Sequence, residues 1–285
     1  MKKRFIILLA CIVLPLVLAV QIFSVSSAVA AGATTSVHIV KYDSCGEVLE
    51  ETDKTYEWLE ENLPVQGDGV THYYHQGPIF EGDMWDPAET LNLKDKGAVR
   101  GTAFKDLGDL VGGMSPGDEI MAKAVDGWHT EFAYENIYEP LEQQGNITLC
   151  WFNGEESLSG EKYGEGYPGN NAYFTAMQLV FLANTPNSEG NYVFGNTDMK
   201  ISLPDEKYQH FYEGLASTNG LSGKWISEIA IYTGGAPFKP GEKLPAADEG
   251  TGKNTLPLLP VLIGVAGLVV IVLCIVLILV RRKQS

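Results

Sequence analysis

The chain has 285 residues, and its 20 Lys and Arg against 36 Asp and Glu give a formal net charge of −16. Two long apolar runs lie near its ends, and the roughly 200 residues between them are polar and rich in Tyr and Gly. This distribution excludes a multi-pass transporter. The acidic charge argues against nucleic acid as a partner, because neutralising phosphates requires clustered Lys and Arg.

Residues 1–31 have the organisation of a secretory signal peptide. A basic start at residues 2–4 precedes an uncharged apolar run over 5–23, and small residues follow up to Ala31. These three features in this order are typical of a cleaved secretory signal. We expect cleavage after Ala30 or Ala31, with an uncleaved membrane anchor as the alternative.

The folded part is predicted over residues 34–235 and begins with a hairpin. Alternating apolar residues predict a strand over 36–42, and the Cys45-Gly46 turn leads back into a second strand at 48–49. Thr55 can cap a short helix over 55–63, which Pro64 ends.

A second helix is predicted over 103–111, with Thr102 as its cap and the pair Gly112-Gly113 at its end. Asp126-Gly127 then favours a tight hairpin of type I′ between two strands. Further strands are predicted over 147–152, 177–183 and 225–232. Many short strands with a few small helices predict an α+β domain.

Residues 236–255 are rich in Pro, Gly, Lys and Glu, so we expect a flexible stalk. Residues 256–280 carry no charge, and at about 1.5 Å per residue they exceed the roughly 30 Å hydrocarbon core of a membrane. Basic residues follow within 281–285, and such residues stay on the cytoplasmic side. The sequence predicts a single-pass protein of the cell membrane with most of the chain outside the cell and a cytoplasmic tail.

The part between the apolar runs is strongly acidic. Six of the 20 basic residues flank the runs, which leaves 14 against all 36 acidic residues, a charge of −22. Arg100 is the only Arg in this part. Cys45 and Cys150 also lie there, and in an oxidising compartment they are a candidate disulfide.

A candidate metal site follows the first helix. His72 and His75 are three residues apart, and both reach one metal ion if the chain turns there. With Glu81 and Asp83 they offer nitrogen and oxygen ligands for zinc or another divalent ion. Two alternatives stay open: a packed loop whose His residues form local hydrogen bonds, and a calcium site of Glu81, Asp83 and Asp86.

Several stretches, in order, resemble the molybdopterin-binding domain of the sulfite oxidase family. An Arg-Gly segment leads into a short helix with typical Leu spacing, an Asp-Gly hairpin follows, an Asn-Gly turn precedes a core strand, and a closing strand ends the domain. These stretches are 97–102 with 104–110, 126–128 with 132–135, 149–154 with 176–180, and 224–229.

The resemblance implies the fold of that family and molybdopterin as a possible cofactor, with Arg100 at its phosphate. It also implies a Cys thiolate on molybdenum upstream of Arg100, but residues 90–96 contain no Cys. Gln178 stands where the family typically has an Arg. Residues 184–223 resemble an insertion able to cover or replace the cofactor mouth.

Three functions follow from these observations. The first is a membrane-anchored cell-surface protein that binds a ligand, an ion or a protein partner without catalysis. The second is an extracytoplasmic molybdopterin-dependent oxidoreductase. The third is an adhesion or cell-envelope module that makes contact through exposed aromatic residues.

Overall fold

The computed structural model describes residues 34–154 and 171–236. All of them belong to the first of two compact units, Met1–Glu242. The predicted signal peptide, membrane helix, cytoplasmic tail and all but the first residue of the predicted stalk lie outside the described residues, so they stay predictions. Within residues 34–154 and 171–236, no helix has both the length and the apolar character needed to cross a membrane.

The described domain is α+β, as predicted, and its largest sheet has five strands in the order β2-β1-β14-β7-β8. The parallel pair β1–β14 places the first long strand beside the last, and the other pairs are antiparallel. The strands are β1 (Ser36–Tyr42), β2 (Val48–Thr55), β7 (Glu119–Ala124), β8 (His129–Ala133) and β14 (Ile226–Tyr232).

A second sheet has four antiparallel strands in the order β10-β9-β6-β3, and smaller sheets are ordered β11-β4-β5 and β12-β13. The four-stranded sheet consists of β3 (Val65–Gln66), β6 (Val99–Ala103), β9 (Asn146–Asn153) and β10 (Ala172–Leu182). The smaller sheets consist of β4 (Tyr73–Gln76), β5 (Leu93–Gly97), β11 (Tyr192–Phe194), β12 (Phe211–Tyr212) and β13 (Leu215–Ala216).

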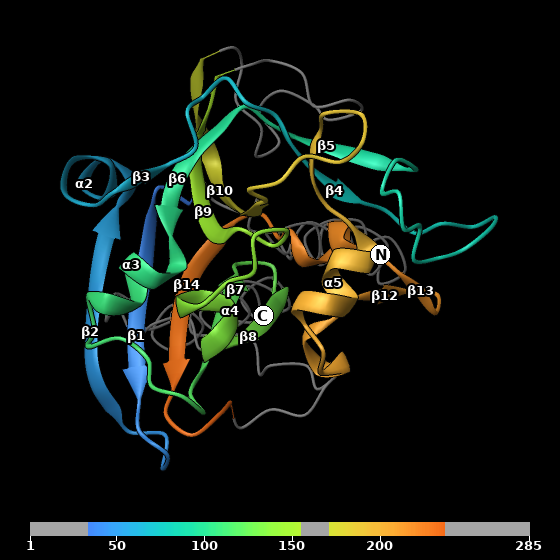
Figure 1. Cartoon of the computed structure of the whole chain (residues 1–285). Helices are drawn as coiled ribbons and strands as arrows, with labels where there is room; N and C mark the ends of the chain where they lie inside the picture. Colours follow the sequence, from blue (N-terminus) through green and yellow to red (C-terminus); the bar gives the residue numbers. More distant parts are fainter. Residues whose placement is uncertain (1–33, 155–170, 237–285) are drawn as a thin grey trace, which may run out of the picture. The chain divides into compact units, whose positions relative to one another are not determined.

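Short helices connect these strands, and the largest core lies between the five-stranded and four-stranded sheets (Figure 1). Ile39 of β1 and Ile229 of β14 pack there with Leu149 of β9 and Leu179 of β10, all fully buried. The helices are α2 (Tyr56–Asn62), α3 (Phe104–Asp109), α4 (Tyr134–Tyr138), α5 (Asn196–Ser202), η1 (Glu206–Tyr208) and η2 (Thr218–Leu221).

The first predicted hairpin and helix are confirmed. β1 turns into β2 through backbone hydrogen bonds between Asp43 and both Gly46 and Glu47. Thr55 caps α2, because its hydroxyl accepts a hydrogen bond from the amide of Trp58 at 3.3 Å. Leu59 is the fully buried residue of that helix.

The predicted cap of the second helix is wrong. α3 starts after Ala103, which makes no side-chain cap. Thr102 belongs to β6, and its buried hydroxyl accepts a hydrogen bond from the indole of Trp151 at 3.1 Å. The end of the helix is as predicted, because Gly113 is left-handed and its amide bonds back to the carbonyl of Gly108.

The hairpin at Asp126-Gly127 forms, but its turn type differs from the prediction. A type I′ turn requires positive φ at both central residues, and only Gly127 has it, at φ 90. The amide of Ala124 bonds to the carbonyl of Trp128, and the amide of Gly127 bonds to Ala124. The loop is therefore a three-residue connection with Gly in the left-handed position.

The predicted insertion 184–223 is built into the core. β11 pairs in parallel with β4, and the buried side chains Met199, Leu203 and Leu221 belong to the main core. The segment therefore contributes buried residues to the core, and its predicted role at a cofactor mouth stays a prediction.

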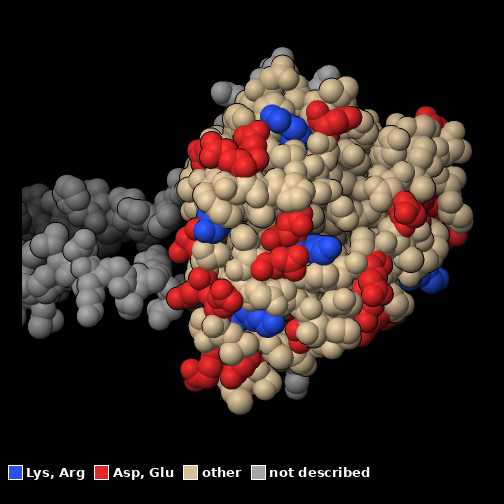
Figure 2. Space-filling view, turned by 60° about the vertical axis from the view of Figure 1, so that its left-hand side comes forward, with Lys and Arg blue, Asp and Glu red and all other residues tan. Residues whose placement is uncertain are grey.

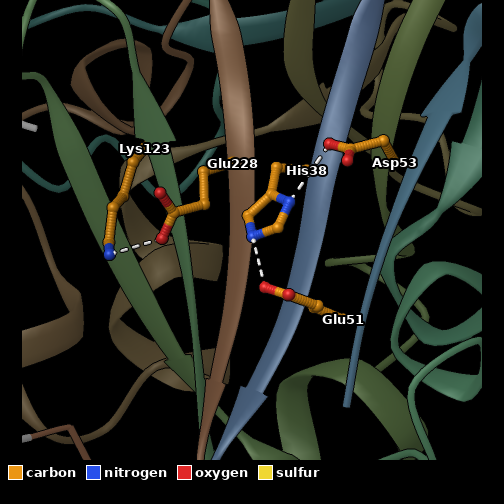
Figure 3. Close-up of polar contacts among 5 residues, drawn as sticks. All are labelled: His38, Glu51, Asp53, Lys123 and Glu228. Atoms are coloured by element: carbon orange, nitrogen blue, oxygen red, sulfur yellow. Dashed lines mark hydrogen bonds and ion pairs between the residues drawn. The ribbon is translucent and has the colours of Figure 1, made fainter. Parts of the chain in front are cut away.

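The side of the five-stranded sheet that faces away from the main core carries charged cross-strand pairs (Figure 3). His38 lies between Asp53, 3.1 Å away, and Glu51, 3.6 Å away. Lys123 of β7 pairs with Glu228 of β14 at 2.6 Å. Acidic side chains also outnumber basic ones on the face shown in Figure 2, where the two kinds are interspersed.

Candidate functional site

Arg100 lies on β6 at an irregularity in the pairing with β9. Arg100 opposes Phe152 while the next residue, Gly101, opposes Cys150. A Cβ at Gly101 would overlap the carbonyl oxygen of Leu149, so only Gly allows the two strands to approach this closely. The bulge turns the Arg100 side chain toward the aromatic residues of β9 and β10.

The guanidinium of Arg100 is already engaged within the domain. It lies 3.4 Å from the carboxylate of Glu60 on α2, and its carbon is 4.0 Å from the ring centroid of Phe152 and 5.5 Å from that of Trp151. Guanidinium groups stack well on aromatic faces. The only positive charge contributed by an Arg between the two apolar runs is thus balanced by a neighbouring carboxylate.

Tyr173 of β10 completes the arrangement. Its hydroxyl donates to both carboxylate oxygens of Glu60, at 3.0 and 3.4 Å, and its ring lies 5.1 Å from the rings of Tyr56 and Phe152. Burial and the hydrogen bond to Glu60 raise the pKa of Tyr173. We call Tyr56, Glu60, Arg100, Phe152 and Tyr173 the Arg100 cluster.

The Arg100 cluster reaches solvent. The Arg100 side chain is 29% exposed and that of Glu60 is 26% exposed, while Tyr173 is 40% exposed. Gly69 borders the cluster, since a Cβ there would lie 3.5 Å from Phe152 and 3.6 Å from Arg100. The cluster therefore offers aromatic ring surface beside a guanidinium donor and a carboxylate acceptor.

The residues around Arg100 do not fit a phosphorylated pterin. A phosphate at the guanidinium would also meet the carboxylate of Glu60. Gln178 is uncharged and buried, and its side-chain amide donates to the hydroxyl of Ser222 at 2.9 Å. Two of the positions that the family resemblance assigns to an anionic group thus provide no uncompensated positive charge.

The cysteine residues do not fit molybdenum either. Cys150 is fully buried on β9, and this burial raises the pKa of its thiol far above the ordinary value. A cysteine ligates a metal as the thiolate, not as the protonated thiol. Cys45 is exposed in the turn between β1 and β2, and both thiols are free, so the candidate disulfide between them is not formed.

His72, directly before β4, and His75, within β4, lie in different surroundings. Nδ1 of His72 lies 2.8 Å from the carboxylate of Asp95 on β5. His75 is fully buried, and its Nε2 accepts the backbone amide of Phe181 at 3.1 Å. Burial lowers the pKa of His75 well below its ordinary value, with Lys96 adding to the effect. The lone pair on Nε2 of His75 is therefore occupied by a hydrogen bond inside the core.

The predicted oxygen ligands Glu81 and Asp83 do not form a metal site with the two His residues either. Glu81 and Asp83 are exposed in the loop between β4 and β5, and Asp83 accepts the amide of Trp85 at 3.1 Å. Asp86 is buried and accepts hydrogen bonds from Gln76, Thr90 and Leu91. No three His, Cys, Asp or Glu residues in the described ranges are arranged to hold a metal ion.

Comparison with protein-family models and with curated proteins finds no match for this chain. The resemblance to the sulfite oxidase family thus depends on its motifs alone. Of the Arg100 cluster, sequence reasoning identified only Arg100. The other members come from α2, β9 and β10, and Tyr173 is 113 positions from Glu60, so local sequence carries no signal of their contact.

Proposed function

We propose that this chain is a membrane-anchored cell-surface protein whose outer domain, on a sulfite-oxidase-like scaffold, binds a ligand without catalysis. The observation that carries the proposal is the ion pair of Arg100 with Glu60 beside the exposed ring of Tyr173 and the partly buried ring of Tyr56. The pair supplies polar groups without net charge, and the rings supply flat apolar surface.

This combination favours an uncharged ligand that has both a flat apolar face and many hydroxyl groups, as a sugar ring has. Tyr173 and Tyr56 offer ring surface for stacking. The guanidinium of Arg100 can donate hydrogen bonds and the carboxylate of Glu60 can accept them. A charge of −22 between the apolar runs further disfavours anionic ligands.

The arrangement also argues against an oxidoreductase that uses molybdopterin. Arg100 has its charge compensated by Glu60, and the pKa of the buried Cys150 thiol is raised. A soft thiolate is the ligand that the resemblance would require for the metal. The charge of Arg100 is compensated, and neither residues 90–96, which contain no Cys, nor the buried Cys150 offers the thiolate.

The proposal is tested by binding of the full chain to an array of neutral oligosaccharides. We expect Tyr173→Ala to weaken binding about two- to tenfold, since one stacked ring contributes about 0.5–1.5 kcal/mol. Tyr212→Ala is the matched control, because Tyr212 is 50% exposed on β12 and lies outside the Arg100 cluster. Absence of any bound oligosaccharide, or equal losses in both variants, would contradict the proposal.

A further inference from the structure

A pair of carboxyl groups joins the loop between β4 and β5 to helix α5. The side chain of Asp198 lies close enough to the Glu89 carboxyl to help raise the pKa of Glu89. The backbone amide of Asp198 also donates to the Glu89 carboxyl at 2.9 Å. Glu89 is only 7% exposed, and a Cβ at Gly195 would overlap its carboxyl, so the group is closely enclosed.

Among the residues that the structure describes, no positive charge compensates this pair. Within the described ranges, no Lys, Arg or His forms an ion pair with Glu89 or Asp198. From the loop, Asp86 adds a negative charge. On α5, the ammonium of Lys200 lies 4.6 Å from the ring centroid of Trp85. Asn187, which packs from a third segment, is uncharged and donates to the carbonyl of Glu89.

The buried carboxyl of Glu89 and the partly buried carboxyl of Asp198 cannot both ionise at low cost, so the pair retains a proton. Burial, the hydrogen bond to Asp198 and repulsion by it raise the pKa of Glu89 from 4.5 to about 8. Asp86, by contrast, has a lowered pKa, because hydrogen bonds from Leu91, Thr90 and Gln76 outweigh its burial.

The loop that this pair holds is strained. Asp86, Glu89 and Asn92 all have positive φ, at 37, 50 and 50, a conformation that costs about 1 kcal/mol or more per non-Gly residue. Three further side-chain hydrogen bonds to the loop come from α5: Thr197 donates to the carbonyl of Trp85 at 2.5 Å, and Asn196 donates to those of Gly77 and Met84. These hydrogen bonds, the one from Asn187 and the contact of Glu89 with Asp198 together hold the strained loop against its neighbours.

We propose that Glu89 and Asp198 form a proton-dependent latch that holds the loop of residues 77–92 against α5. With the proton present, the two carboxyl groups attract each other and the loop stays closed. When the proton leaves, two like charges repel in a buried position. Opening of the loop then relieves both this repulsion and the backbone strain, and it exposes Trp85.

The direction of the pH dependence follows from proton binding. The closed loop keeps its proton up to about pH 8, whereas Glu89 in an open, hydrated loop returns to a pKa near 4.5. Between these two values each pH unit shifts the equilibrium about tenfold toward the open loop. Stability of the closed loop is greatest below about pH 4.5, falls up to about pH 8 and then levels off.

Hydrogen exchange of the full chain tests the latch at pH 5.5, 6.5, 7.5 and 9, after correction for intrinsic exchange rates. We expect the opening constant of peptides from residues 77–92 to rise by up to about 100-fold from pH 5.5 to 7.5. Above about pH 8 it should stay constant. Peptides from β9 serve as the internal reference, because that strand is in the core.

Glu89→Gln replaces the titratable carboxyl by an uncharged amide that still has a hydrogen-bond donor and an acceptor. The loop of this variant should therefore stay closed, with an opening constant independent of pH. Glu81→Gln, an exposed position in the same loop, should keep the wild-type pH dependence. Asp198→Asn removes the neighbouring charge, so its opening constant should level off at a lower pH. A wild-type loop without pH dependence, or one whose dependence persists in Glu89→Gln, would overturn the proposal. If the variants do not fold, the pH dependence of the opening constant in the wild-type chain tests the proposal by itself.

Discussion

Gly145, directly before β9, is a position where both the backbone conformation and the neighbouring strand require glycine. It is left-handed at φ 63, and a Cβ there would overlap the carbonyl oxygen of Leu182 on the neighbouring strand. Gly46 in the first hairpin is also left-handed, at φ 85, but a Cβ there would meet open space. Comparing substitutions at these two positions therefore distinguishes the cost of backbone strain from the cost of steric overlap.

Gly46→Ala is expected to lower the free energy of unfolding by about 1–2 kcal/mol, the cost of a left-handed Ala. Gly145→Ala should cost about 1–3 kcal/mol more, because the overlap forces the two strands apart. Urea unfolding of the full chain in detergent measures both values. Equal losses in the two variants would mean that β9 and β10 are not packed as described.

The two thiols of the domain should differ in reactivity. Cys45 is exposed, whereas Cys150 is buried and its thiol has a raised pKa. We expect iodoacetamide at pH 8 to alkylate Cys45 in the native protein and to reach Cys150 only after denaturation. Peptide mapping distinguishes the sites, and recovery of a Cys45–Cys150 disulfide would contradict the structure.

At the scale of elements, α5 decides whether residues 184–223 belong to the core. Met199 is fully buried there, while Ile201, two positions later on the same helix, is 53% exposed. We expect Met199→Ala to lower the free energy of unfolding by about 2–5 kcal/mol. Ile201→Ala should change it by less than about 0.5 kcal/mol. Similar small effects of both substitutions would show that the segment is peripheral.

Elements with a local signal could be predicted from sequence, and elements that depend on distant partners could not. β1 alternates apolar and polar residues, and α2 begins at a capping Thr55, so both were predicted. β4 and β5 carry mainly polar residues and exist through pairing with each other and with β11. The Arg100 cluster and the Glu89–Asp198 pair were missed for the same reason, since each joins segments far apart in the chain.

At the scale of the whole molecule, the acidic charge should make stability depend on salt. Repulsion within a part of charge −22 opposes the compact state, and the Debye length falls from about 30 Å at 0.01 M to about 8 Å at 0.15 M salt. We therefore expect the melting temperature of the full chain to rise by about 2 °C or more over this range. A fall would mean that ion pairs such as Lys123–Glu228 outweigh the repulsion.

The central proposal is that this domain binds a ligand without molybdenum chemistry. It is supported by the compensated charge of Arg100, by the lack of a Cys in residues 90–96 and by the raised pKa of the buried Cys150 thiol. The most direct test is the metal and pterin content of the full chain purified from a host that makes molybdopterin. We predict far less than one molybdenum or tungsten atom per chain and no pterin fluorescence after denaturation. Close to one metal atom per chain, together with released pterin, would contradict the account.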